Sequence, residues 1–209
     1  MADSQSAAQT VTIVGAGPVG AALGTNLLRQ GHRVRFAVRN QAADVPSAAT
    51  TISIDGCAKG SDLTILAVPF PAVADVVPRL GLSDGDVLID ATNPFGEAVP
   101  DGYACGNAYV QSLASPGVHV AKAFGVLGVE HMAEPSLPGG VAPVLPVAAD
   151  DDGVRDRVVG LARGMGFDAV AVGGLENAAL LEQAALYWGL LAFTGGRGRG
   201  FVLVAHNRG

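Results

Sequence analysis

The sequence has 209 residues, of which 49% are hydrophobic and 15% are charged, so it can fill one sizeable core with a small added lobe. Its formal net charge of −6 and its content of only two lysines, Lys59 and Lys122, argue against a nucleic-acid-binding protein. The two cysteines are not spaced as metal ligands. Residues 1–9 lack the basic and apolar regions of a signal peptide. No apolar stretch is long enough to cross a membrane. We therefore expect a cytoplasmic protein that binds neither nucleic acid nor membrane.

A glycine-rich turn lies between the first predicted strand and the first predicted helix. The β-branched run at residues 11–14 stops at three glycines with the spacing G-x-G-x-x-G, and residues 21–30 follow as a helix. In this context Gly15 permits the tight turn, Gly17 lets a pyrophosphate approach the backbone, and Gly20 lets the helix pack close to the strand. The helix N-terminus then offers N–H groups to the phosphates. We therefore predict that the turn binds a dinucleotide.

The second predicted strand determines which dinucleotide is expected. Apolar residues alternate over residues 34–38, and this strand ends roughly 20 residues past the glycine turn, where a dinucleotide fold contacts the adenosine ribose. NAD enzymes usually have an acidic residue at this place, but this chain has Arg39. A guanidinium can bind a 2′-phosphate in a bidentate manner, which favours NADP(H) over NAD(H). The alternative is that Arg39 is a solvated strand end.

Strands and helices alternate along the rest of the chain, which predicts an α/β fold. Strands are expected at residues 50–54, 63–69, 86–94, 118–125, 144–148, 168–172 and 201–205, and helices at residues 71–80 and 108–114, from about 153 to 165, and at 176–193. The order predicts a Rossmann-type, doubly wound, mostly parallel sheet. The passage at residues 134–143 is rich in proline and glycine, and it marks either a lobe boundary or a mobile loop. We divide the chain into an NADP-binding domain, residues 1–140, and a small C-terminal α/β lobe, residues 141–209, which would supply the substrate cleft and a dimer contact.

Several polar residues lie at or near the predicted strand ends, where ligands bind in open α/β sheets. Asn93 follows one strand and either hydrogen-bonds near the nicotinamide or only starts an Asn-Pro turn. Lys122 lies among apolar residues and is either a general acid, a phosphate contact or a side chain whose stem reaches solvent. His131 is a surface or core residue, or a catalyst.

The C-terminal part of the sequence contains an acidic run and a strongly apolar helix. Residues 150–152 are three aspartates, which fit the N-terminus of a helix better than a metal site. The helix at residues 176–193 is apolar around most of its circumference, so we expect it to be buried. Either a second subunit or the chain's own sheet would cover it, and a homodimer is the favoured alternative.

Several segments taken together resemble one family, the NADPH-dependent F420 reductases (coenzyme F420:NADP oxidoreductases). The segments that carry the resemblance are residues 14–20, 66–69, 89–94, 121–124, 166–169 and 174–178. The resemblance implies a Rossmann domain with a small C-terminal lobe, usually in a homodimer. It also implies direct hydride transfer between NADP(H) and a deazaflavin, coenzyme F420. Such transfer holds two rings face to face and needs little acid–base chemistry, so no catalytic side chain is assigned.

Carried over by position, the resemblance assigns cofactor contacts to the glycine turn, to the end of the second strand, and to three later strand ends. The residues assigned to cofactor binding are Gly15, Gly17, Pro18, Val19, Gly20, Arg39, Val68, Pro69, Asn93, Pro94 and Ala123. The chain departs from the family at Gly125, where the family commonly has Asn, at Val38, where it often has a small hydroxylated residue, and at residues 149–151.

Two alternative functions remain open at this point. One is an NADPH-dependent reductase of a small carbonyl or imine, which needs a proton donor, for which Lys122, His131 and Tyr109 are the candidates. The other is a non-catalytic module that senses NADP(H).

Overall fold

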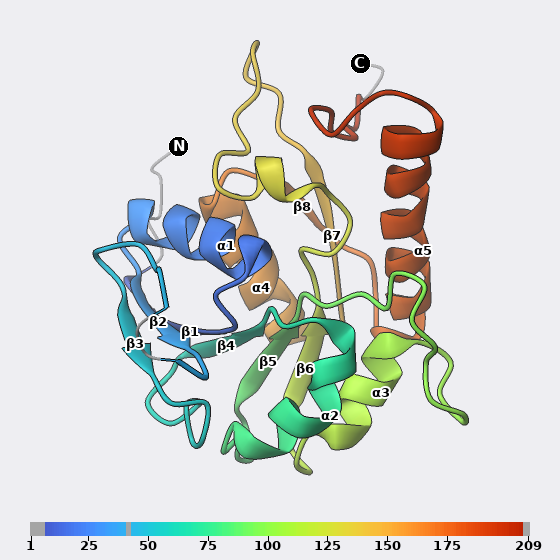
Figure 1. Cartoon of the computed structure of the whole chain (residues 1–209). Coiled ribbons are helices and arrows are strands. Elements are labelled where there is room, and N and C mark those ends of the chain that lie inside the picture. Colours follow the sequence, from blue (N-terminus) through green and yellow to red (C-terminus); the bar gives the residue numbers. More distant parts are fainter. Residues whose placement is uncertain (1–6, 41–42, 207–209) are drawn as a thin grey trace.

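The computed structural model describes residues 7–40 and 43–206 and shows one eight-stranded sheet with helices on both faces (Figure 1). The strands are β1 (Thr10–Val14), β2 (Arg33–Ala37), β3 (Thr50–Ile52), β4 (Leu63–Leu66), β5 (Val87–Asp90), β6 (His119–Lys122), β7 (Val144–Ala149) and β8 (Asp168–Ala171). The α-helices are α1 (Pro18–Arg29), α2 (Val73–Val76), α3 (Gly106–Leu113), α4 (Asp152–Gly164) and α5 (Ala178–Gly189). The predicted Rossmann-type α/β fold is confirmed.

The strand order, β3-β2-β1-β4-β5-β6-β7-β8, reverses direction between β1 and β4. All neighbouring pairs are parallel except β6 and β7, which are antiparallel. Ligands of such sheets bind beyond the carboxyl ends of the strands at the point of reversal. The glycine turn lies there, directly after β1.

Two apolar cores, one on each face of the sheet, hold the helices in place. Helices α1 and α4 pack on one face, and α2 and α3 pack on the other (Figure 1). The central strands β1, β4 and β5 contribute to both cores, as expected for strands covered on both sides. Within the described residues, no helix is both long and apolar enough to span a membrane.

Two predicted elements differ from the structure. The helix expected at residues 71–80 is split into α2 and two flanking 3₁₀ turns, since Pro78 lacks the N–H group that a continuous helix needs. The edge strand expected at residues 201–205 is wrong. That segment gives β7 a single backbone bond, from Val144 N to Leu203 O at 3.0 Å, and the ring of Phe201 stacks on Trp188 instead.

The predicted C-terminal lobe begins after a loop at residues 134–143 that has no helix or strand. Its strands β7 and β8 pair with each other, and β7 continues the main sheet by pairing with β6 at Ala121–Ala149 and Lys122–Ala148. The lobe therefore extends the sheet of the first domain. The division into residues 1–140 and 141–209 stays a prediction.

Helix α5 is only half covered by its own chain. Its inner face, with Ala185 and Trp188, is buried, whereas Leu180 and Tyr187 on the outer face are 66% and 54% exposed. The alternative that the chain's own sheet covers the whole helix is therefore wrong, because the chain's own core covers one face only. The homodimer that would cover the outer face stays a prediction.

Candidate functional site

The glycine turn has the geometry of a phosphate cradle. Gly15 has a φ of +105°, and a Cβ atom added to it would lie 2.6 Å from the carbonyl oxygen of Ala67. A Cβ on Gly20 would lie 2.2 Å from the carbonyl oxygen of Gly15. By contrast, a Cβ on Gly17 would meet open space, and no side chain caps α1 at this residue. The backbone at Gly17 therefore faces an open volume at a helix N-terminus, which suits a phosphate group.

Alanine at Gly17 and at Gly20 should separate ligand binding from packing. We expect Gly20→Ala to lower the free energy of unfolding by about 1–3 kcal/mol, because its methyl group collides with backbone. Gly17→Ala should change that free energy by less than about 0.5 kcal/mol, because its methyl group meets open space. It should still weaken NADPH binding about tenfold, a cost of about 1.4 kcal/mol. Chemical denaturation and fluorescence titration measure the two effects, and an unchanged NADPH Kd in Gly17→Ala would contradict the assignment.

Arg39 lies just beyond β2, beside the glycine turn. The turn and the strand are joined by a hydrogen bond of 3.0 Å from Gly15 N to Ala37 O. The Arg39 side chain is exposed, and within residues 7–40 and 43–206 no hydrogen bond or ion pair holds it. The exposed Arg39 side chain follows a strand whose end contacts the turn, so it is available for a phosphate, but its role stays a prediction.

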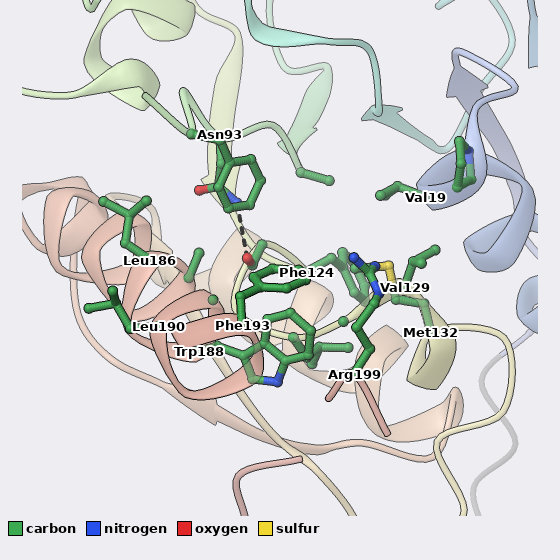
Figure 2. A pocket seen from close by; sticks show the side chains of 18 of the residues that line it. Val19, Asn93, Phe124, Val129, Met132, Leu186, Trp188, Leu190, Phe193 and Arg199 are labelled. Atoms are coloured by element: carbon green, nitrogen blue, oxygen red, sulfur yellow. Dashed lines mark hydrogen bonds between the residues drawn. The ribbon is translucent and has the colours of Figure 1, made fainter. Parts of the chain in front are cut away.

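A cavity of about 900 Å³ opens between the start of α1, the ends of β5 and β6, and α5 (Figure 2). Its polar lining side chains are Asn93, Gln183, Thr194 and Arg199. The other lining residues are apolar or glycine: Pro18, Val19, Ala91, Phe95, Phe124, Gly125, Leu127, Gly128, Val129, Met132, Ala185, Leu186, Trp188, Gly189, Leu190 and Phe193. The size and the apolar walls suit a largely hydrophobic ring system.

Asn93 and Gly125 meet at the wall of this cavity. The Nδ2 of Asn93 donates to the carbonyl oxygen of Gly125 at 2.9 Å, while its buried Oδ1 has no partner in the described structure. A Cβ at position 125 would lie 2.7 Å from Nδ2, so glycine rather than the family's asparagine fits beside Asn93. The preceding Phe124 is fully buried with a φ of +63°, a strained conformation that tends to occur at functional sites. Asn93 therefore does more than start a turn.

A buried polar network lies behind the cavity and joins β5, β6, α3 and α5. The Nζ of Lys122 is 2.9 Å from Oδ2 of Asp90 and 3.3 Å from Oε1 of Glu182. Glu182 also accepts the N–H groups of Gly106 and Asn107, at 3.0 and 2.8 Å, at the start of α3. Two carboxylates thus share one lysine, and one of them, Glu182, also accepts from the N-terminus of α3.

The network decides one alternative that the sequence left open. Lys122 is 1% exposed, so the interpretation that its stem reaches solvent is wrong. The reason is that Asp90 and Glu182, together with the carbonyl oxygen of Thr92, satisfy its ammonium group inside the protein.

None of the candidate proton donors lines the cavity. Lys122 is held in the buried network. Tyr109 packs against Phe70 and Tyr103, with ring centroids 6.3 and 5.0 Å away. His131 is buried beside the cavity, and its Nε2 has no partner among the described residues.

Burial raises the pKa of the Cys57 thiol to about 11, so this thiol is not a nucleophile near neutral pH.

The structure distributes the predicted cofactor residues over four places. Pro18, Val19 and Asn93 line the cavity. Val68 lies against Gly15 at the turn, together with the exposed Pro69. Pro94 lines a smaller neighbouring cavity, and Ala123 is buried beneath the end of β6. The assignment of all these residues to cofactor binding stays a prediction.

Sequence reasoning missed most of the cavity wall and one member of the buried network. Met132, Trp188, Phe193 and Arg199 come from segments that have no motif. Glu182 had a recognisable signal, because it is the only charged residue in α5.

The acidic run has the structural role that its sequence favours. The Asp151 side chain accepts the N–H of Val154 at 2.8 Å and caps α4. Across residues 7–40 and 43–206, no cluster of three or more His, Cys, Asp or Glu side chains is arranged to hold a metal ion.

The sequence model of one family, described as "NADP oxidoreductase coenzyme F420-dependent", matches residues 10–94. This stretch runs from β1 through Asn93 and includes the glycine turn and Arg39. The match confirms the resemblance drawn from the sequence, and with it the prediction of an NADP-dependent oxidoreductase. No curated protein matches the chain in sequence.

Solved structures share the fold. A protein provisionally assigned as an F420-dependent NADP reductase from Arthrobacter sp. FB24 is 20% identical, with a TM-score of 0.81 over 95% of this chain and 100% of its own. A hypothetical protein from Sinorhizobium meliloti is 25% identical, with a TM-score of 0.72 over 82% of this chain and 88% of its own. A reductive aminase from Aspergillus terreus, in complex with NADPH and ethyl levulinate, is 21% identical, with a TM-score of 0.66 over 90% of this chain and 63% of its own.

Proposed function

We propose that the protein transfers a hydride between NADP(H) and a deazaflavin, coenzyme F420, bound in the 900 Å³ cavity. The observation that carries this proposal is the chemistry of the cavity wall. It is largely apolar and lies at the strand ends where a Rossmann fold holds the nicotinamide, and none of the described lining residues carries a carboxyl, imidazole, phenol, thiol or amine group. A reaction that needs only two rings in contact fits this wall better than one that needs a proton donor.

In this proposal the chain's residues bind and orient rather than react. The turn from Gly15 to Gly20 holds the pyrophosphate, and Arg39 holds the 2′-phosphate. Asn93 lines the cavity, and its unpartnered Oδ1 can accept a hydrogen bond from the nicotinamide carboxamide. The apolar walls exclude water from the two rings, which protects the hydride during transfer. We further propose that a homodimer covers the outer face of α5.

One alternative has support from the comparisons. The fold of the reductive aminase matches 90% of this chain, which keeps an imine or carbonyl acceptor as the second candidate. The matched part is 63% of the aminase chain, so the remainder of that enzyme lies outside the match. None of the described lining residues is one of the candidate proton donors, which favours the deazaflavin.

The test is anaerobic mixing of the protein with NADPH and oxidised coenzyme F420, with NADH as a parallel control. We expect loss of the deazaflavin absorbance, much faster with NADPH than with NADH. Tight NADPH binding without turnover would reject the deazaflavin and direct the search to imines and carbonyls. NADPH binding without turnover on any acceptor class would favour a sensing module instead.

A further inference from the structure

Arg199 is the only charged side chain that lines the cavity, among the residues that the structure describes. It belongs to residues 195–206, which follow the helical end of α5 at the top of Figure 1. The indole N–H of Trp188 donates to the carbonyl oxygen of Phe201 at 3.3 Å, and the two rings stack with centroids 5.4 Å apart. The segment that carries Arg199 is therefore fixed against the cavity wall.

The guanidinium of Arg199 is oriented by aromatic rings and by one carboxylate. It lies 5.9 Å from the ring centroid of Trp188 and 5.8 Å from that of Phe193, both of which line the cavity. Glu130, which does not line the cavity, accepts from Nε and Nη2. In Figure 2 the side chain extends toward Val129 and Met132, on the side of the cavity away from Asn93.

Arg199 keeps hydrogen-bonding capacity for a ligand. A guanidinium has five N–H donors, and within residues 7–40 and 43–206 no group accepts a hydrogen bond from its Nη1. The chain carries a formal net charge of −6, so an anionic ligand would meet overall repulsion unless a local cation offset it. A positive charge at the edge of an apolar cavity supplies that offset.

We propose that Arg199 binds an anionic group of the hydride acceptor, so that the cavity selects a flat aromatic acceptor with a negatively charged substituent. This inference rests on the proposed function and adds the residue that would determine acceptor specificity. The phosphates of NADPH would be held separately, by the glycine turn and Arg39.

The experiment compares two deazaflavins that share the ring system and differ in whether they carry an acidic tail. Coenzyme F420 carries a phosphate-bearing acidic tail, and its deazariboflavin core has the same tricyclic ring without that tail. Binding of each to the complex of the protein with NADP⁺ is followed by fluorescence, which requires no turnover. We expect Arg199→Gln to weaken binding of coenzyme F420 about tenfold to hundredfold, with little change for the core or for NADPH.

Glu130→Gln is the matched control, because it removes the ion pair but keeps the cation. We expect this variant to bind coenzyme F420 as well as the wild type does. An equal loss in Glu130→Gln, an equal loss for both deazaflavins, or a raised NADPH Kd would each overturn the role of Arg199. If the wild type binds both deazaflavins but does not reduce them, the proposed hydride transfer is rejected. The effect of Arg199→Gln on the binding of the two deazaflavins still tests the role of Arg199. If the wild type binds neither, both proposals are rejected.

Discussion

Replacing Lys122 with methionine should lower the free energy of unfolding by about 3–5 kcal/mol, because it leaves two buried carboxylates without their shared cation. Asp90 is fully buried and Glu182 is 7% exposed, so water cannot replace the ammonium group. Methionine keeps most of the side-chain volume, which separates the loss of charge from the creation of a cavity. A loss of this size is a large part of the stability of an ordinary domain, about 5–15 kcal/mol. Chemical denaturation followed by circular dichroism measures it.

Two variants serve as controls for this result. Lys59 is the other lysine of the chain and is exposed, so Lys59→Met should change the free energy of unfolding by less than about 0.5 kcal/mol. The double variant Lys122→Met with Glu182→Gln should be more stable than Lys122→Met alone, because it removes one of the two uncompensated charges. If the double variant is less stable than Lys122→Met, the claim that Lys122 compensates the buried charge of Glu182 is wrong.

The elements that were predicted well from sequence are those defined by local pattern. Residues 11–14 and the glycines after them specify a strand, a turn and a helix within a short stretch, and the structure contains all three. The broken helix at α2 could have been anticipated from Pro78, which interrupts the backbone hydrogen bonds. Residues 201–205 have the composition of a strand, but the stacking of Phe201 on Trp188 outweighs that local preference.

In the candidate site, too, the sequence predicts the residues that depend on local pattern and misses those that depend on packing. The glycine turn and Arg39 are predicted from spacing along the chain, because each would act through its own backbone or strand end. The pairing of Lys122 with Glu182 joins residues of β6 and α5, and it depends on how these elements pack. The cavity wall likewise combines the start of α1, the segments that follow β5 and β6, α5 and the C-terminal segment, so no motif describes it. A single charged residue in a largely apolar helix, as at Glu182, is the sequence feature that predicts a buried charge partner here.

Replacing Arg39 with aspartate should reverse the expected cofactor preference. If Arg39 binds the 2′-phosphate, its loss removes a charge-assisted contact of roughly 1.5–3 kcal/mol, about a tenfold to hundredfold loss in affinity for NADPH. The new carboxylate also repels that phosphate, and it can accept hydrogen bonds from the ribose hydroxyls of NADH. We therefore expect a higher Kd for NADPH together with an unchanged or lower Kd for NADH. Fluorescence titration with both nucleotides tests this without an acceptor.

Arg33→Asp is the control on the same strand. Arg33 is exposed at the opposite end of β2, where its Nε donates to Oγ1 of Thr10 at 3.0 Å, so the same change of charge is made away from the glycine turn. We expect this variant to keep the wild-type ratio of NADPH to NADH affinity. If Arg39→Asp and Arg33→Asp shift the ratio equally, the effect comes from net charge alone. An unchanged ratio in Arg39→Asp would show that Arg39 is a solvated strand end and that another residue selects the nucleotide.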